Sequence, residues 1–457
     1  MKETSLFDSL LEEPQKPSGP VTCLGITFEN DEARRAHFTE ELRKKLQDPE
    51  FRKIEGFPIG SDEDILNLSD PPYYTACPNP WITDFIAEWE AQKPEQPEGH
   101  HYHREPFAAD VSEGRSGIFY DAHSYHTKVP HKAIMRYILH YTQPGDIVFD
   151  GFCGTGMTGV AAQMCNDREA IMSLGYQVKP DGAILQEEVN EDGRRLWKPF
   201  SKLGVRRAVL NDLSTAAAFI AYNFNAPVDV NALEKAAKNL IASVESECGW
   251  IYETRHAASG AKGKVNYIIW SDVFICSNCL SEIVFWNSAV DLSLGKIKDS
   301  IECQDCGANH SKSSLDRVWL SEFSAADKSI VKKAKQIPVL INYTCEGKRY
   351  EKRPDAEDLA LVDEINGIEI DEAAGETIIP DGFNTRQPKL SHGVSRVRAF
   401  YTRRNFYALS ALRKNLPSGR VGKAMEFLIN SYDLTHSTLM TRVILTGGGT
   451  KPALTGY

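Results

Sequence analysis

The sequence predicts an α/β fold that carries a separate small β module, and two stretches support this prediction. Residues 146–163 have the pattern of a strand, a glycine-rich turn and the start of a helix. Residues 265–310 alternate apolar and polar side chains around two pairs of closely spaced cysteines. With 457 residues, 42% of them hydrophobic, the chain is long enough to form two or three domains.

The first predicted elements are a tail, a helix and a strand. Residues 1–20 are expected to form a flexible tail, and residues 31–47 mix charged residues with spaced apolar ones. This mixture predicts an amphipathic helix capped near Asn30 or Asp31. A short buried strand is then predicted from an apolar run, Ile65, Leu66 and Leu68.

Two prolines end this predicted strand. Pro71 and Pro72 lack a backbone N–H and fix φ, so the chain must leave the sheet at Asp70. The Asp70 carboxylate, the Pro71 carbonyl and the Tyr73 ring are then expected beyond the carboxyl end of a strand, where open α/β sheets bind ligands. For an isolated Asp-Pro-Pro sequence, an ordinary turn is the alternative interpretation.

A second candidate binding element follows a predicted helix over residues 132–141 and a strand that ends at Asp150. The glycine-rich turn contains Gly151, Phe152, Cys153, Gly154, Thr155 and Gly156. Such a turn brings the backbone close to a ligand, and the helix that follows supplies oriented N–H groups. A lone turn of this kind is also common as a simple connection between a strand and a helix.

An acidic residue, Asp212, follows the next predicted strand, residues 208–210. An acid at this position is where such folds hold a ribose diol. The polar residues 166–206 between the two strands are longer than a minimal connection, and we interpret them as an insertion. Residues 215–222 and 231–247 predict two further helices.

Four cysteines form two Cys-x-x-Cys pairs that are separated by 23 residues: Cys276, Cys279, Cys303 and Cys306. This spacing is close to that of a four-cysteine zinc ribbon. Four thiolates leave no open position for water, so such a zinc ion is expected to be structural. The alternative is that the four cysteines are buried independently of one another.

The net charge of −11 argues weakly against a nucleic-acid partner, but the charge is unevenly distributed. Residues 351–380 are expected to form an acidic linker, whereas residues 382–425 contain ten basic residues and no acid. Basic residues among aromatic ones predict contacts to DNA phosphates from Arg396, Arg398, Arg403 and Arg404. The alternative is a helix whose aromatic face is buried and whose arginines lie in solvent.

Taken together, these motifs resemble those of the DNA N6-adenine and N4-cytosine amino-methyltransferases. Asp70 to Tyr73 match their (D/N/S)PP(Y/F) motif in full. The turn after Asp150 resembles their cofactor loop, with Gly151 in place of the usual proline, and His126 to Pro130 resemble the element before that loop. With its four-cysteine arrangement, the chain is most similar to the zinc-ribbon-containing adenine-specific DNA methylases of bacteria and archaea.

The resemblance implies a Rossmann-like S-adenosylmethionine-dependent methyltransferase sheet with a permuted motif order and an inserted zinc-ribbon β module. In this interpretation Asp70 and the Pro71 carbonyl accept hydrogen bonds from the substrate amine. Pro72 helps to hold that carbonyl, and Tyr73 stacks on a flipped base. The residues implied to bind S-adenosylmethionine are Thr127, Lys128, Asp150, Gly151, Phe152, Cys153, Gly154, Gly156 and Asp212.

The expected reaction is methylation of adenine N6 in double-stranded DNA, within a restriction or phage-defence system. N4-cytosine or RNA-base methylation is the first alternative, and a non-catalytic DNA-binding or scaffold subunit is the second. Residues 75–125 are too few for the strands and recognition region that usually follow such a motif. The missing strands are expected from residue 265 onward, in residues 400–445 or beyond residue 457, so a fragment of a longer product is one interpretation.

The expected organisation has five parts. These are a tail and helix (1–64), a methyltransferase core (65–250), a zinc-ribbon module (265–350), an acidic linker (351–380) and a basic segment that contacts DNA or completes the core (381–457). The chain shows neither a signal peptide nor an uncharged apolar run of membrane-spanning length. A cytoplasmic protein without a membrane partner is therefore expected.

Overall fold

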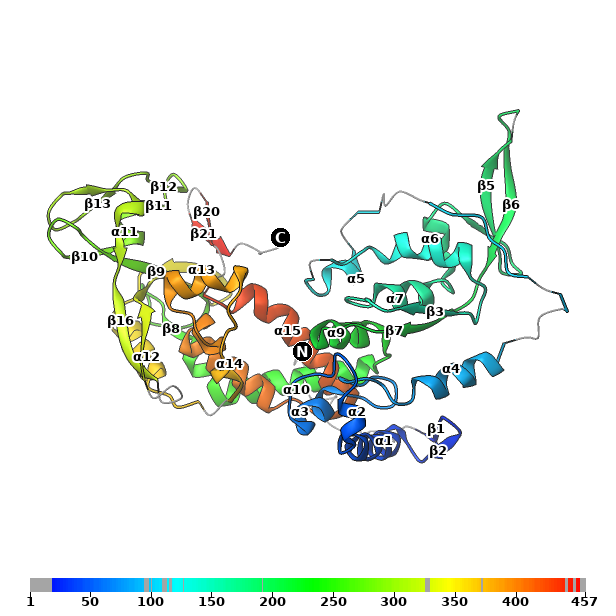
Figure 1. The fold of residues 1–457 in the computed structure, drawn as a ribbon. Helices are drawn as coiled ribbons and strands as arrows, with labels where there is room; N and C mark the ends of the chain where they lie inside the picture. The colour runs from blue at the N-terminus through cyan, green and yellow to red at the C-terminus, as the bar shows by residue number, and fades with distance from the viewer. Residues whose placement is uncertain are drawn as a thin grey trace, which may run out of the picture. The chain divides into compact units, whose positions relative to one another are not determined.

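The computed structural model forms two compact units, which are described separately. The first contains residues 1–229 and 418–427, and the second contains residues 230–417 and 428–457. Figure 1 labels the helices and strands of both units. The structure describes residues 19–93, 98–99, 101–108, 113–114, 117–125, 127–190, 192–324, 329–370, 373–439, 443–446 and 449–452.

A hairpin and several helices form the N-terminal part of the first unit. The helix predicted for residues 31–47 is confirmed, and the Asn30 side chain caps it by accepting a hydrogen bond from the Ala33 amide at 2.8 Å. Residues 1–18 of the expected tail lie outside the described residues. The elements are β1 (Val21–Cys23), β2 (Ile26–Phe28), α1 (Asp31–Leu46), α2 (Pro49–Arg52), α3 (Asp62–Leu68) and α4 (Ile82–Ala91).

The strand predicted from Ile65, Leu66 and Leu68 is wrong, because these residues lie in helix α3. Ser61 caps this helix, and its backbone and side chain exchange hydrogen bonds with Asp64 at 3.2 Å and 3.1 Å. This reciprocal capping satisfies two amides that would otherwise lack partners at the helix start. The apolar residues of α3 pack into a buried cluster with α1. The capping residues at Ser61 and Asp64 therefore favoured a helix, although the short apolar run had indicated a strand.

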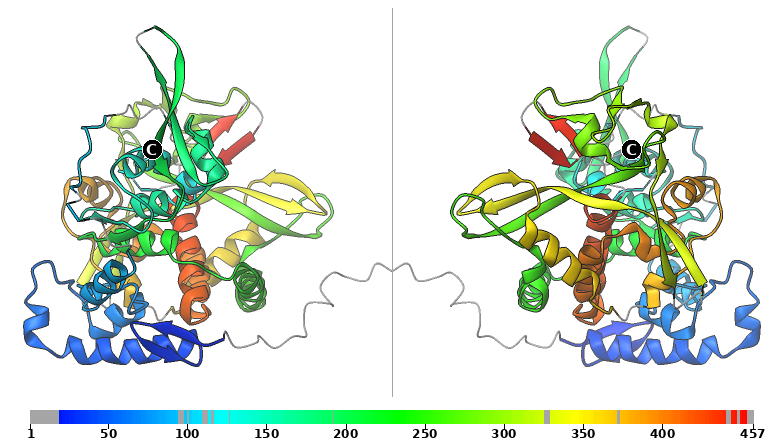
Figure 2. Two further views of the ribbon diagram at one scale, coloured as in Figure 1. Left: turned by 90° about the vertical axis from the view of Figure 1, so that its right-hand side faces the viewer. Right: turned by 90° about the vertical axis from the view of Figure 1, so that its left-hand side faces the viewer.

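The rest of the first unit contains the glycine-rich turn. The strands and helices predicted around it are confirmed to within a few residues. The expected insertion, residues 166–206, contains a helix and an antiparallel sheet of order β4-β5-β6, and its β5–β6 hairpin projects from the neighbouring helices (Figures 1 and 2). The elements are α5 (Ile118–Asp121), α6 (His131–Tyr141), β3 (Ile147–Asp150), α7 (Met157–Met164), α8 (Arg168–Ser173), β4 (Gln177–Val178), β5 (Ala183–Val189), β6 (Arg195–Lys202), β7 (Arg207–Leu210) and α9 (Thr215–Asn225).

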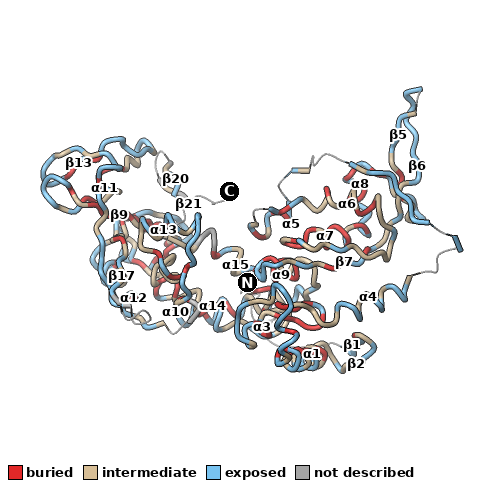
Figure 3. Tube along the Cα trace, viewed as in Figure 1, coloured by how far each residue is buried: buried red, intermediate tan, exposed pale blue. Residues whose placement is uncertain are grey.

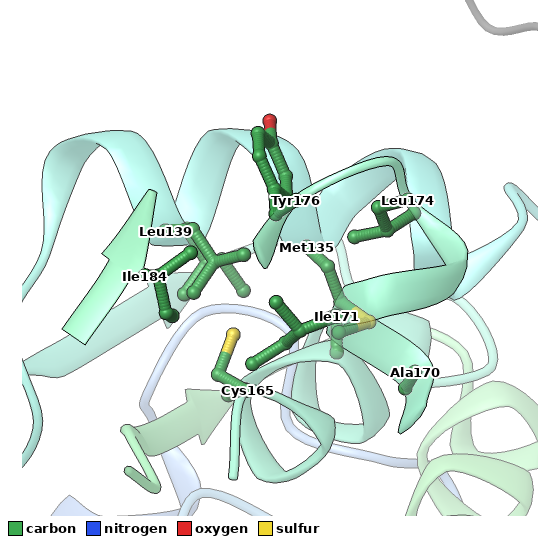
Figure 4. Close-up of a cluster of buried hydrophobic side chains, with 11 residues drawn as sticks. Met135, Leu139, Cys165, Ala170, Ile171, Leu174, Tyr176 and Ile184 are labelled. Carbon is green, nitrogen blue, oxygen red and sulfur yellow. The ribbon is translucent and has the colours of Figure 1, made fainter. Parts of the chain in front are cut away.

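The main core of this unit lies among α6, α7, α8 and β5 (Figure 4). Its most deeply buried members come from these elements and from Cys165 at the end of α7: Met135, Leu139, Ala161, Ala162, Cys165, Ile171 and Ile184. Figure 3 shows that α7 is largely buried, whereas the outer part of the β5–β6 hairpin is exposed. This core fixes α7, and with it the turn from which α7 begins.

The strands that flank the glycine-rich turn, β3 and β7, are parallel, with Asp150 opposite Leu210. In the part of the chain that the structure describes, their sheet contains these two strands. The Phe149 side chain on β3 is 71% exposed. The expectation that strands after residue 265 complete this sheet is wrong for the described residues, because those strands pair with one another instead.

The second unit is built around one long strand, β9, which pairs antiparallel with β8, β10, β15 and β18. Part of the expected acidic linker forms helix α12, whose Ile365 is buried. In the described residues, no helix has the length and apolarity needed to cross a membrane.

Helices and mostly short strands make up the rest of the second unit around β9. The helices are α10 (Val230–Cys248), η1 (Gly249–Tyr252), α11 (Phe285–Ala289), η2 (Lys312–Ser314), α12 (Ala356–Asn366), η3 (Ala373–Glu376), α13 (Phe383–His392), η4 (Val397–Phe400), α14 (Arg403–Lys414) and α15 (Gly419–His436), the last of which begins in the first unit. The strands are β8 (Glu253–Arg255), β9 (Lys262–Ile275), β10 (Glu282–Val284), β11 (Val290–Asp291), β12 (Lys296–Ile297), β13 (Ile301–Glu302), β14 (Asn309–His310), β15 (Asp316–Arg317), β16 (Trp319–Ser324), β17 (Ser329–Ala334), β18 (Gln336–Cys345), β19 (Lys348–Lys352), β20 (Val443–Thr446) and β21 (Gly449–Pro452).

Candidate active site

The glycine-rich turn is held at both ends by the two parallel strands. The carboxylate of Asp150 accepts hydrogen bonds from the Phe152 amide at 3.1 Å and the Thr158 hydroxyl at 2.5 Å. The carboxylate of Asp212, beyond the end of β7, accepts a hydrogen bond from the Gly154 amide at 2.9 Å. Asp150 and Asp212 were predicted as site residues, and the structure places both against the turn.

The glycines at this turn are required by backbone geometry and by a close neighbour. Gly154 and Gly156 have φ of +51° and +72°, in the left-handed region that favours glycine. A Cβ atom at Gly156 would lie 2.7 Å from the Cβ of Ala221 on α9. Glycine therefore allows α9 to pack directly against the start of α7.

The remaining side chains of the turn differ in exposure. Phe152 is 92% exposed, so it is free to contact a ligand. Cys153 is buried, and burial raises the pKa of its thiol to about 12, so it is a poor nucleophile at neutral pH. Thr155 was not predicted as a site residue. Its hydroxyl is buried and has no hydrogen-bond partner among the described residues, which marks a polar group available to a ligand.

Thr127 and Lys128 lie beside the turn but have different roles. Thr127 is exposed, and its hydroxyl is 4.0 Å from the position of a Cβ atom at Gly154. Lys128 is buried, and its ammonium group donates to the backbone carbonyls of Tyr120 and His123. Burial lowers the pKa of Lys128 to about 8. Lys128 thus positions the backbone of the segment before Thr127, while the predicted His126 lies outside the described residues.

The Asp-Pro-Pro-Tyr motif forms a tight turn next to α1 and α9. The backbone of Asp70 exchanges two hydrogen bonds with that of Tyr74, at 2.9 Å and 3.1 Å. Asp70 is 4% exposed, and Pro71 and Pro72 are also buried. The motif is therefore more enclosed than a site at the open end of a sheet would be.

The two predicted acceptors for a substrate amine already have partners. The Asp70 carboxylate accepts hydrogen bonds from Arg35 at 2.8 Å and from the Tyr222 hydroxyl at 2.5 Å. The Pro71 carbonyl accepts one from Arg34 at 2.6 Å. Burial alone would raise the pKa of Asp70, but the charge and hydrogen bond of Arg35 lower it below its usual value.

The third feature of the motif, the Tyr73 ring, is available. Tyr73 is 52% exposed, and its ring faces the Arg34 guanidinium at 4.7 Å and the Phe85 ring at 5.6 Å. Its exposed part can contact a planar ligand. Arg34, Arg35 and Tyr222 were not predicted, because the sequence does not show which distant side chains meet the motif.

Helix α9 connects the Asp-Pro-Pro-Tyr motif to the glycine-rich turn. Ala221 touches the turn at Gly156, and the next residue, Tyr222, binds Asp70. The Tyr222 ring also stacks on Tyr74 at 4.7 Å between ring centroids. Two motifs that are far apart in the sequence are thus held by neighbouring residues of one helix.

The four predicted cysteines come together in the second unit. Their sulfur atoms all lie within 4.8 Å of one another, and two pairs, Cys276 with Cys306 and Cys279 with Cys303, are 3.7 Å apart. Sulfur atoms around a tetrahedral zinc ion at about 2.3 Å are roughly 3.8 Å apart, so the cluster has the dimensions of such a site. A further unpredicted neighbour, His310, places its Nε2 3.3 Å from the Cys276 sulfur.

The two cysteine pairs have matching backbone geometry. The amides of Cys276 and Cys303 donate to carbonyls five residues later, at 2.9 Å in each case. The residues that follow the pairs, Leu280 and Gly307, have φ of +66° and +71°. Two turns of the same form therefore present the four thiols to one point.

The four arginines predicted to contact DNA are buried or partly buried, and their contact with DNA stays a prediction. Arg396 and Arg404 are each 8% exposed. Arg396 and Arg398 bind Glu376, and Arg403 donates to the Ile368 carbonyl. The alternative of solvated arginines does not hold for Arg396 and Arg404, because both side chains are buried.

A comparison with protein families now bears on these motifs. Residues 28–182 match the model of a family described as DNA methylase, of the N6-adenine and N4-cytosine type. This segment is similar to that family. It contains the Asp-Pro-Pro-Tyr motif, Thr127, Lys128 and the glycine-rich turn, whereas Asp212 and the cysteine cluster lie outside it. Searches of curated proteins and of solved structures found no match.

The family match supports DNA amino-methyltransferase activity with S-adenosylmethionine as the expected cofactor and DNA as the substrate. Both exocyclic amines, adenine N6 and cytosine N4, are substrates within the family, so the match leaves the base open.

Proposed function

We propose that this chain is an S-adenosylmethionine-dependent DNA methyltransferase that acts on adenine N6. The observation that carries the proposal is the glycine-rich turn, which lies inside the segment that matches DNA methylases and follows β3, the strand that pairs in parallel with β7. By resemblance, the order of the motifs, with Asp70 before Asp150, supports DNA over RNA or protein as the substrate, and the leading aspartate supports adenine over cytosine. The parallel strands support a Rossmann-like sheet with permuted motif order.

The turn has the features expected of a cofactor site. Thr155 offers an unpaired hydroxyl, Thr127 and Phe152 are exposed beside the turn, and Gly156 opens helix α7. Asp212 uses one hydrogen bond on each carboxylate oxygen, to Gly154 and Ser214, and has lone pairs left to accept from ribose hydroxyls. S-adenosylmethionine, when bound, supplies an electrophilic methyl group.

The Asp-Pro-Pro-Tyr motif would then receive the substrate base. Tyr73 stacks on a flipped adenine, and Asp70 with the Pro71 carbonyl accepts hydrogen bonds from its amine. In this step the amine replaces the Arg34 guanidinium at the Pro71 carbonyl. Arg35 and Tyr222 keep Asp70 ionised and oriented, because both bind the carboxylate in the folded protein.

The cysteine cluster supports a structural zinc ion in a ribbon module. Cys276, Cys279, Cys303 and Cys306 would hold the ion as thiolates and join the ends of two hairpins. A cytoplasmic role in a restriction or phage-defence system is proposed on resemblance alone.

A non-catalytic DNA-binding subunit is the second candidate, and one observation favours it. Both predicted amine acceptors are buried and bound by arginines, so the motif also serves to join α1 to α9. A purely structural motif of this kind would hold the fold together without methyl transfer.

Sequencing that detects modified bases distinguishes these functions in cells that express the full chain. We expect N6-methyladenine at one DNA motif with the wild type and the exposed control Asp84→Ala, and none with Asp70→Ala. Tyr73→Ala, at an exposed position, serves as a second variant in case Asp70→Ala does not fold. N4-methylcytosine would overturn the adenine assignment, and a methylated base in RNA would overturn the DNA assignment. S-adenosylmethionine binding without any modified base would favour the non-catalytic subunit.

A further inference from the structure

The second unit contains a cavity of about 410 Å³ that the proposed methyltransferase function does not use. Its wall is formed by parts of β9, β16, β17, α12, η4 and α14. This volume falls in the range of about 300–1,000 Å³ that is typical of sites for small molecules.

The cavity wall is strongly cationic. Its single acidic member is Glu322, and its six basic members are Lys332, Lys333, Arg396, Arg398, Arg403 and Arg404. The difference, six minus one, is a formal charge of +5. Glu376 compensates part of this charge by binding Arg396 and Arg398. A positive excess remains, and it favours an anionic ligand.

Among these basic residues, Arg404 is buried and, within the described part of the chain, lacks a hydrogen-bond partner at one of its nitrogens. It is 8% exposed, and its Nε atom is fully buried without a hydrogen-bond partner among the described residues. Its guanidinium faces the ring of Tyr252 at 5.9 Å. A buried N–H of a charged group without a hydrogen-bond partner is costly, since polar and charged groups in protein interiors are normally paired.

The nearest acid does not meet this need. Asp358 is close enough to influence the Arg404 guanidinium, but its carboxylate is bound by Lys352 at 2.7 Å and by the Thr254 hydroxyl at 2.6 Å. Asp358 also accepts a hydrogen bond from the Asp355 amide at 3.0 Å. The Asp358 carboxylate is therefore already bound by other groups. An anionic ligand is the remaining partner for Arg404.

The remainder of the wall suits a phosphate-bearing molecule. Thr402, Arg403 and Arg404 at the start of α14 line the cavity, and the first amides of a helix favour negative charge. Trp270 and Tyr401 add half-buried aromatic rings to the same wall. Aromatic rings beside cationic groups are the combination that binds a base and a phosphate together.

We propose that this cavity binds a phosphate-bearing ligand of nucleotide size through Arg404. A free nucleotide and a phosphate of DNA share this chemistry, and the size of the cavity favours the free nucleotide. This activity is independent of methyl transfer, because no residue of the glycine-rich turn or the Asp-Pro-Pro-Tyr motif lines the cavity.

Calorimetric titration and thermal unfolding of the full chain test the proposal. The probes are pyrophosphate, ADP, ATP and a short DNA duplex, without S-adenosylmethionine. We expect at least one of these phosphate compounds to bind and to raise the melting temperature of the wild type. Arg404→Met should weaken that binding at least tenfold, whereas Arg386→Met, at an exposed position of the same basic segment, should leave it unchanged.

Two further comparisons keep the test decisive. Without ligand, Arg404→Met should melt no lower than the wild type, because it removes an unpaired buried charge. Arg404→Lys keeps the charge but not the planar fork, and should bind with intermediate affinity. Binding of the duplex alone, lost in Arg404→Met, would support the cavity and identify DNA as the phosphate source. If no phosphate compound binds, or if Arg404→Met binds as well as the wild type, the proposal is wrong.

Discussion

The guanidinium of Arg34 on α1 donates a hydrogen bond to the carbonyl oxygen of Pro71 at 2.6 Å. The adjacent Arg35 binds the Asp70 carboxylate at 2.8 Å. Two neighbouring residues of one helix therefore cover both acceptors of the motif on which the proposed chemistry depends. The motif links α1 to α9 and is also the proposed site for an amine. The link requires Arg34 to bind the Pro71 carbonyl, whereas amine binding requires Arg34 to leave it.

Replacement of Arg34 tests how much its contacts with the Asp-Pro-Pro-Tyr motif contribute to stability. Arg34 is 1% exposed, and its removal leaves the Pro71 carbonyl and part of the Asp70 charge without a partner. We expect Arg34→Met to lower the free energy of unfolding by about 1–3 kcal/mol, measured by urea denaturation, because it leaves a buried acceptor unsatisfied. Arg43→Met on the same helix, where the side chain is 40% exposed, is the control, and an equal effect of both variants would contradict a special role of Arg34.

The lowered pKa of Asp70 predicts how stability depends on pH. Arg35 and Tyr222 hold the folded-state pKa of Asp70 below its unfolded value of about 3.9. The stabilisation is therefore complete above about pH 4 and is lost as the pH falls through the folded-state pKa. The difference in unfolding free energy between the wild type and Asp70→Asn should shrink from pH 7 to pH 3. A difference that stays constant over this range would exclude an ionised, paired Asp70.

The sequence-based prediction succeeded where structure depends on neighbouring residues. The glycine-rich turn is an example, because a strand, closely spaced glycines and a helix start are all local signals, and Asp212 follows the next strand directly. The cysteine cluster is a second example, since the spacing within each pair largely fixes a turn that presents both thiols.

The prediction failed where distant contacts decide the outcome. Nothing near Asp70 in the sequence shows that Arg34, Arg35 and Tyr222 converge on it. The burial of Arg404 was missed for a related reason, because composition gives its charge but not its surroundings. The short apolar run before the motif was too brief to separate a strand from a helix, and the cap at Ser61 decided it.

Alanine substitution at two glycines separates backbone strain from close packing at the glycine-rich turn. Gly156 and Gly175 both have positive φ, +72° and +90°, but a Cβ at Gly156 meets Ala221 at 2.7 Å while one at Gly175 meets nothing within 4 Å. We expect Gly175→Ala to cost about 1 kcal/mol from strain alone. Gly156→Ala should cost about 1–3 kcal/mol more, because it also forces α9 away from α7.

The affinity for S-adenosylmethionine, measured by calorimetry, is the second readout for Gly156→Ala and Gly175→Ala. Gly156→Ala should weaken binding at least tenfold, because the displaced turn no longer presents the amides of its loop and helix start. Gly175→Ala should bind as the wild type does. Equal affinities of the two variants would argue against a cofactor site at this turn.

Zinc removal tests the cysteine cluster. We expect one zinc ion per chain by elemental analysis, and we expect its loss in Cys303→Ser, since a four-thiolate site loses a ligand. The matched control is Cys345→Ser, at a buried cysteine of β18 outside the cluster, which should keep its zinc. Chelation should lower the melting temperature of the wild type and leave that of Cys303→Ser unchanged, because the ion joins two hairpins only when all four thiolates are present. A chain that binds no zinc, or a Cys303→Ser variant that retains it, would show that the four sulfurs meet for another reason.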